Sequence, residues 1–102
     1  MVLKFFWQPR EIIHHPDTLV SLNNLAVFHK AQGNYSLAQQ LYEKNLKVRE
    51  EILGVSHPST LSSLNNLAGL YHAQGNYSLA QELYKKSLRL REEILAESHP
   101  DT

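Results

Sequence analysis

The stretch AQGNYSLAQ occurs twice in this sequence, at residues 31–39 and again at residues 73–81. In each copy a Gly-Asn pair separates two segments with apolar residues at helical spacing. Both residue types tolerate the left-handed backbone that ends a helix. The stretch therefore predicts a tight turn between two helices, and its recurrence predicts the same turn twice.

The repetition extends well beyond this stretch. When residues 15–56 are aligned with residues 57–98, 29 of the 42 positions are identical. A period of this length is typical of stacked supersecondary units. We therefore divide the chain into two repeats, 15–56 and 57–98. Residues 1–14 form an apolar N-terminal segment that is a partial repeat or a cap, and residues 99–102, HPDT, are the start of a missing repeat.

Each repeat is predicted to form two helices. The first begins at the HPDT or HPST phrase, where proline suits the opening helical position. Mainly apolar residues then recur at spacings of three and four, which predicts one buried face. In the first repeat this face consists of Leu19, Leu22, Leu25, Ala26 and the polar His29, and in the second of Leu61, Leu64, Leu67, Ala68 and Tyr71. The second helix begins at Tyr35 or Ser36. The fold class is all-α, with tandem antiparallel helical hairpins forming an α-solenoid of two full repeats plus terminal fragments.

Composition excludes several classes of function. The 102 residues carry equal numbers of basic and acidic side chains, so no field recruits nucleic acid or an anionic membrane. Cysteine is absent, and no apolar run approaches the length of a membrane span. The opening MVLKFFWQPR is interrupted by Lys4 and lacks a small-residue cleavage site, so we expect no signal peptide and a cytoplasmic location.

Catalytic and metal sites are not expected. The six histidines include His57, which stands at the joint between repeats, where a role in starting a helix is favoured over metal ligation. His29 is expected in a core or half-buried position. Neighbouring carboxylates in the two REE triplets point apart on a helix, and no glycine-rich phosphate loop is present. We therefore expect a protein that is not an enzyme and that uses no cofactor and no metal.

The segment LNNLAGLYHAQGNYSLAQELYKKSL, at residues 64–88, resembles the tetratricopeptide repeat. The 42-residue length and the phrase REEIL near the end of the repeat look like the longer variant found in kinesin light chains and many bacterial arrays. Two positions depart from the family pattern: His29 stands where an aromatic is usual, and Glu50 and Glu92 replace the proline that closes the shorter repeat. The second helix is therefore expected to run on for about two more turns.

The resemblance implies a protein-interaction module that binds a peptide or protein partner on a concave face lined by the first helices. Carried over by position, that face comprises Val20, Asn23, Val27, Lys30, Ser62, Asn65, Gly69 and His72. A carboxamide such as Asn23 or Asn65 offers a donor and an acceptor to a peptide backbone. The alternative, that each is only a polar residue tolerated on an exposed face, is equally favoured. The lysine-and-asparagine clamp that holds C-terminal carboxylates in some relatives is not reproduced.

A second function is suggested by apolar residues near both ends of the chain. Stacked repeats bury their apolar faces against neighbouring repeats, and three or more units are usually needed for stability. The side chains available for self-association are Phe5, Phe6, Trp7, Leu90, Ile94 and Leu95. The alternative function is therefore a self-assembling homo-oligomer. A closed two-fold dimer is favoured, because head-to-tail stacking continues into fibres.

Overall fold

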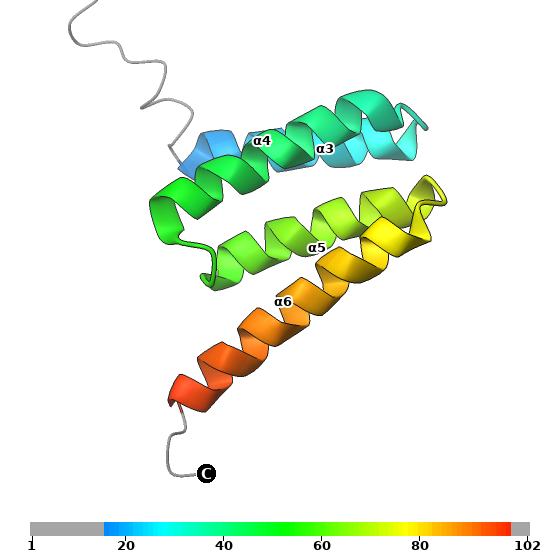
Figure 1. The fold of residues 1–102 in the computed structure, drawn as a ribbon. Helices are drawn as coiled ribbons and strands as arrows, with labels where there is room; N and C mark the ends of the chain where they lie inside the picture. The colour runs from blue at the N-terminus through cyan, green and yellow to red at the C-terminus, as the bar shows by residue number, and fades with distance from the viewer. Residues whose placement is uncertain (1–15, 99–102) are drawn as a thin grey trace, which may run out of the picture.

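The computed structural model describes residues 16–98, and these residues form two helical hairpins (Figure 1). The first hairpin consists of α3 (Pro16–Ala31) and α4 (Tyr35–Leu53). The second consists of α5 (Pro58–Ala73) and α6 (Tyr77–Ser98). The predicted all-α class and tandem hairpins are confirmed, and α4 begins at Tyr35 as the sequence indicates.

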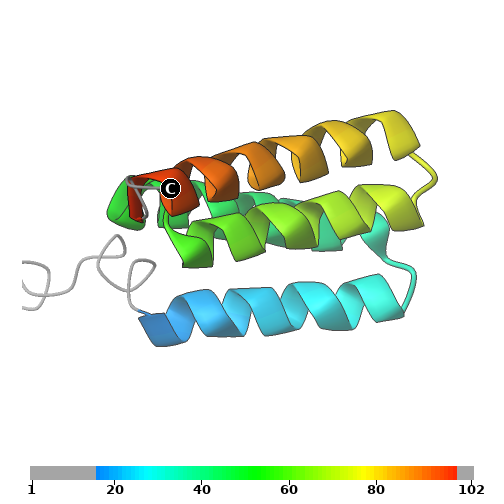
Figure 2. The ribbon, with the colours of Figure 1, turned by 90° about the horizontal axis from the view of Figure 1, so that it is seen from below.

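The four helices stack in chain order. Helix α4 packs against α3 within its own hairpin and also against α5 of the next, and α6 packs against α5. In the two views, α3 and α5 lie toward one side of the molecule and α4 and α6 toward the other (Figures 1 and 2). Helices α4 and α5 therefore have a neighbouring helix on both sides, whereas α3 and α6 stand at the ends of the stack.

Helix ends are set by local residues. Gly33 and Gly75 adopt φ angles of 80° and 81°, the left-handed conformation expected after the first helix of each hairpin. Asn34 then caps α4, its side chain accepting the Leu37 N–H, and Asn76 accepts the Leu79 N–H in the same way. The predicted turn is thus present in both hairpins with the same hydrogen bond.

The second helices end differently. Gly54, with a φ of 92°, terminates α4 and connects it to α5. Ala96 occupies the equivalent place in the second repeat, and α6 continues as a helix to Ser98. A positive φ angle is unfavourable for alanine, because its Cβ atom then lies too close to the backbone. The alanine in place of glycine therefore explains why α6 is longer than α4, with 22 residues against 19.

The core lies where α3, α4 and α5 meet. Ala26 of α3, Ala38 and Tyr42 of α4, and Leu67 and Leu70 of α5 form one buried cluster. A buried polar group accompanies it: Asn45 Nδ2 donates to the Leu19 carbonyl at 2.8 Å, and Asn45 Oδ1 accepts from Arg49 Nε at 2.6 Å and from the Ser63 hydroxyl at 3.5 Å. Asn45 thereby joins three helices.

One sequence prediction about the core is wrong. Leu25 belongs to the predicted buried face of α3, but its side chain is exposed. Its equivalent in the second repeat, Leu67, is buried against α4. No helix among the described residues occupies the corresponding position beside α3, so an identical pattern of spacing leads to a different environment.

Candidate functional site

The residues predicted to bind a partner lie along one side of α3 and α5. We call them the inner strip, which consists of Val20, Asn23, Val27 and Lys30 on α3 and Ser62, Asn65, Gly69 and His72 on α5. Seven other residues of α5 are buried against its neighbours. The strip positions of α5 are spaced three and four residues apart, so they share one side of the helix. This is the side of α5 that remains open to solvent.

A hydrogen bond connects the α3 half of the strip to a residue of α5 that lies next to the strip. Asn66 of α5 donates from Nδ2 to Oδ1 of Asn23 on α3 at 2.9 Å. The acceptor of Asn23 is therefore engaged. Asn65 is half-buried, and its carboxamide has no hydrogen-bond partner within residues 16–98. Of the two asparagines singled out by the sequence, Asn65 is the one whose donor and acceptor are both available.

Gly69 leaves a gap in the strip that two polar side chains approach. A Cβ placed on Gly69 would lie 3.5 Å from the Tyr84 hydroxyl and 3.6 Å from Lys30 Nζ. The hydroxyl from α6 and the ammonium from α3 thus come together over α5. Tyr84 is not among the predicted site residues, because it belongs to a second helix and the predicted face consists of first-helix residues. The glycine at 69, where the first repeat has Val27, is the sequence feature that points to it.

Two open hollows border the strip. One, of about 350 Å³, adjoins His72 and is lined by side chains of α6 that include Tyr77, Gln81 and Tyr84. The other, of about 270 Å³, adjoins Val20 and lies between the start of α3, the end of α4 and the start of α5. Both linings are mainly apolar, with Lys85 in the first and Arg49 in the second. The strip is therefore bordered by places where apolar side chains of a ligand can be held.

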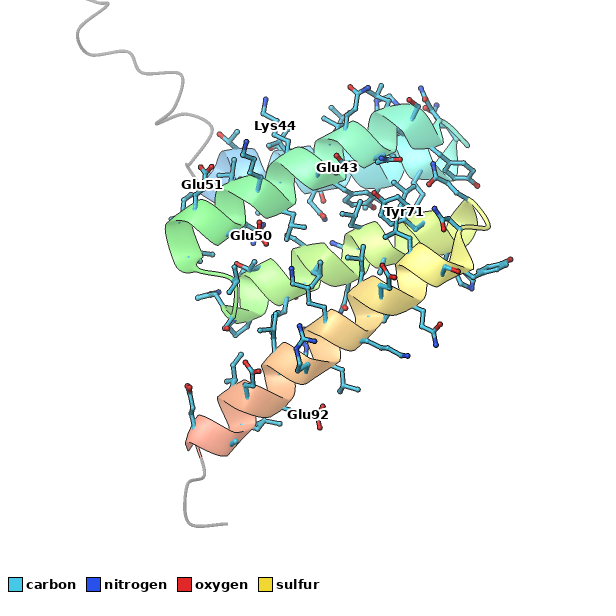
Figure 3. The ribbon with its side chains drawn as sticks, in the orientation of Figure 1. Glu43, Lys44, Glu50, Glu51, Tyr71 and Glu92 are labelled. Atoms are coloured by element: carbon cyan, nitrogen blue, oxygen red, sulfur yellow. The ribbon has the colours of Figure 1, made fainter. Side chains whose placement is uncertain are left out.

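Beside the strip, Tyr71 joins α5 to α4. Its hydroxyl hydrogen-bonds to Glu43, and Figure 3 shows the tyrosine between the two helices below that glutamate. Burial raises the pKa of Tyr71, and the charge of Glu43 and this hydrogen bond raise it further. Burial also raises the pKa of Tyr42. Both phenols are therefore held in the neutral form, as structural groups suited to a packed interface.

Two of the described histidines, His57 and His29, occupy structural positions. His57 caps α5, with its Nδ1 accepting the Ser59 N–H at 3.0 Å, which confirms its predicted place at a helix start. His29 is half-buried as expected, and its Nδ1 is buried without a hydrogen-bond partner in the described part of the chain. Within residues 16–98 there is no group of three or more His, Cys, Asp or Glu residues positioned to hold a metal ion.

The residues predicted for self-association fall into three groups. Leu95 is exposed on α6, whereas Leu90 and Ile94 on the same helix are half-buried and therefore less accessible. Phe5, Phe6 and Trp7 lie outside the described residues. The exposed apolar side chains that the sequence analysis did not select include four on the two end helices: Leu25, Phe28, Tyr84 and Leu88. Their repeat equivalents are core or core-flanking residues, so only their position in the two end helices distinguishes them.

The helical stack and its open strip define a class of protein, the helical-repeat scaffolds, and comparison with known proteins identifies the family. The family model for the tetratricopeptide repeat matches residues 17–93, and the chain belongs to this family. Repeats of this kind are generally non-catalytic modules that bind other proteins. No curated protein matches the chain. None of the described helices is both long and apolar enough to cross a membrane.

Two of the solved structures that are similar to this chain show the repeat type. Both contain the nearly identical TPR-like repeats of a Podosopora anserina protein provisionally assigned as a kinesin light chain. One, a variant with a glutamine replaced by methionine, is 31% identical with a TM-score of 0.70, and the match covers 85% of this chain and 39% of that one. The other is 32% identical with a TM-score of 0.71, covering 78% and 38%. The present chain thus spans about two fifths of their length, and the predicted kinesin-light-chain-like repeat type is confirmed.

Proposed function

We propose that the chain binds an extended segment of another polypeptide along the inner strip, without catalysis. The observation that carries the proposal is the half-buried carboxamide of Asn65, which has no partner within residues 16–98 and lies on the open side of α5. A carboxamide can donate to a backbone carbonyl and accept from a backbone N–H, so it suits a peptide ligand of varied sequence.

The surroundings of Asn65 support a peptide rather than a small polar ligand. Ser62 precedes it by less than one turn, and the gap over Gly69 follows it with Lys30 and Tyr84 at its edge. The hollows beside Val20 and His72 can receive apolar side chains of the segment. Backbone hydrogen bonds would then supply general affinity, and the hollows would supply selectivity.

The test uses random peptides, each about 12 residues long, displayed on phage and selected on the immobilised full chain. For the selected peptides, Asn65→Ala should weaken binding about fivefold to tenfold, the equivalent of one or two hydrogen bonds. Gln40→Ala is the matched control, since it removes a carboxamide from the exposed side of α4. Equal binding by wild type and Asn65→Ala, or no peptide selected at all, would contradict the proposal.

A second candidate function is self-association, and a specific observation favours it. Large apolar side chains are exposed on the two helices at the ends of the stack, Leu25 and Phe28 on α3 and Tyr84, Leu88 and Leu95 on α6. Apolar groups gathered on a surface in this way are typical of an interaction site. The molar mass of the full chain, measured by light scattering at several concentrations, tests it, and a constant monomer would contradict it.

A further inference from the structure

The joint between α4 and α5 shows how one repeat of this chain binds the next. Tyr42 and Ala38 of α4 pack against Leu67 and Leu70 of α5, with Leu46 and Tyr71 at the border of the cluster. Polar contacts accompany this packing. In addition to the hydrogen bond of Tyr71 to Glu43, the Ser63 hydroxyl donates to Asn45 Oδ1, and the Thr60 hydroxyl donates to the Arg49 carbonyl at 3.3 Å. The joint is therefore a defined set of apolar and polar contacts.

Both surfaces of this joint occur a second time in the chain, and within residues 16–98 no helix covers either of these copies. Helix α6 repeats the α4 surface, but Tyr84 is 44% exposed where Tyr42 is 3%, and Leu88 is 59% exposed. Helix α3 repeats the α5 surface, but Leu25 is 46% exposed where Leu67 is 5%, and Phe28 is 54% exposed where Leu70 is fully buried. Each uncovered surface is thus a copy of one half of a joint that the chain already makes.

We infer that the α6 surface of one molecule binds the α3 surface of a second copy of this chain, in the register of the α4–α5 joint. The inference rests on the self-association proposed above and assigns its geometry. Tyr84 and Leu88 would pack against Leu25 and Phe28 of the second copy. The Thr18 hydroxyl of the second copy would face the Arg91 carbonyl of the first. These two residues are the equivalents of Thr60 and Arg49, which form a hydrogen bond within the chain.

The copied joint is close to the original but not identical. Leu70 becomes Phe28 and Asn45 becomes Ser87, so the apolar character is kept and one polar contact is lost. Lys85 takes the place of Glu43, and His29 takes the place of Tyr71. The carboxylate is lost, but the lysine can donate a hydrogen bond and the imidazole can accept one. No position of the joint acquires two facing charges of the same sign when His29 is neutral. The second copy is therefore a chemically suitable occupant.

This geometry differs from the closed dimer favoured by the sequence alone. A two-fold interface would place α6 against α6 or α3 against α3. The joint observed within the chain instead pairs a second helix with a first helix, and it uses two different surfaces. Repeating such a joint gives head-to-tail association that continues beyond two molecules.

Two complementary variants test the geometry. Leu25→Asp places a charge on the α3 surface and leaves α6 intact, and Leu88→Asp does the reverse; both side chains are exposed, so the fold should be retained. Each variant alone should associate at least about tenfold more weakly than wild type, because a carboxylate would be buried at the joint. An equimolar mixture should form a complex of one chain of each, measured by light scattering after a sizing column.

The controls and outcomes separate the two proposals. Ala31→Asp and Arg89→Asp change exposed residues whose equivalents, Ala73 and Lys47, lie outside the α4–α5 joint, so both should associate as wild type does. If wild type remains a monomer at every concentration, self-association itself is overturned, and this inference with it. If wild type associates while one variant still dimerises alone and the mixture forms no complex, the interface is two-fold and only the head-to-tail geometry is overturned.

Discussion

The two hairpins of this protein share most of their residues, yet equivalent residues occupy different environments. Leu67 and Tyr42 are buried, whereas their counterparts Leu25 and Tyr84 are exposed. The difference does not follow from the hairpins themselves, since both have the same turn and the same cap. It follows from their neighbours: among the helices of residues 16–98, α4 and α5 pack against two others, and α3 and α6 against one. In a stacked fold, the position of a helix in the stack determines whether a given side chain is buried or exposed.

The strongest expected contrast is between two leucines at equivalent positions. Leu67→Ala removes a buried side chain and should lower the free energy of unfolding by about 2–5 kcal/mol. Leu25→Ala removes an exposed one and should cost roughly 0.5 kcal/mol or less. Urea unfolding of both variants at low protein concentration, where association is absent, provides the comparison. Equal losses would mean that the two repeats have equivalent surroundings after all.

The next contrast concerns the buried polar residues of the second helices. Asn45→Ala would leave the Leu19 carbonyl without its partner and should cost about 1–3 kcal/mol of unfolding free energy. Ser87, its equivalent, is buried with its hydroxyl unpartnered within the described residues. Ser87→Ala should therefore be neutral or slightly stabilising. Thermal unfolding measures both, and a Ser87→Ala loss as large as that of Asn45→Ala would contradict this account.

The helix caps should behave alike in the two repeats, because they depend only on local contacts. Asn34→Ala and Asn76→Ala each remove the acceptor of one N–H at the start of α4 or α6. Each should lower the free energy of unfolding by about 1 kcal/mol. The measurement is again denaturant unfolding. A difference between the two much larger than experimental error would show that the turns are coupled to the stack.

The smallest effect involves Tyr71, which has no tyrosine counterpart in the first repeat. Its pKa is raised above the ordinary 10.0 by burial and by Glu43. The folded protein keeps this proton longer than the unfolded chain, so the stabilisation is complete below about pH 10 and is lost as pH rises through the folded pKa. Tyr71→Phe should reduce the loss of stability above about pH 10.

An absorbance titration of the tyrosinate signal gives a direct check of this prediction. Glu43→Gln removes the charge and should lower the pKa of Tyr71 toward its ordinary value. A Tyr71 titration that is the same in wild type and Glu43→Gln would show that Glu43 has no influence on the phenol.

Much of the fold could be predicted from the sequence because its determinants are local. The turn at Gly33, the cap at Asn34 and the start of α5 at Pro58 depend on residues within a few positions of one another. The second helix also runs on to Leu53, as the missing proline suggests. These features repeat wherever the local sequence repeats.

The remaining features depend on contacts between helices and could not be predicted from one repeat. The bond from Asn66 to Asn23 spans two hairpins and distinguishes Asn23 from Asn65, although both occupy the same place in the repeat. The approach of Tyr84 and Lys30 to Gly69 joins three helices. Helical spacing alone could place the inner strip along one side of two helices, but the differences within the strip required the arrangement of the stack.

Amide hydrogen exchange, followed helix by helix at two protein concentrations, tests the central claim most directly. At low concentration α4 and α5 should exchange slowest, and α3 and α6 faster, since exchange reports local stability rather than sequence. At high concentration α3 and α6 should become protected together as copies stack. Equal protection of all four helices at low concentration would contradict the claim that position in the stack, and not repeat sequence, determines the stability of each helix.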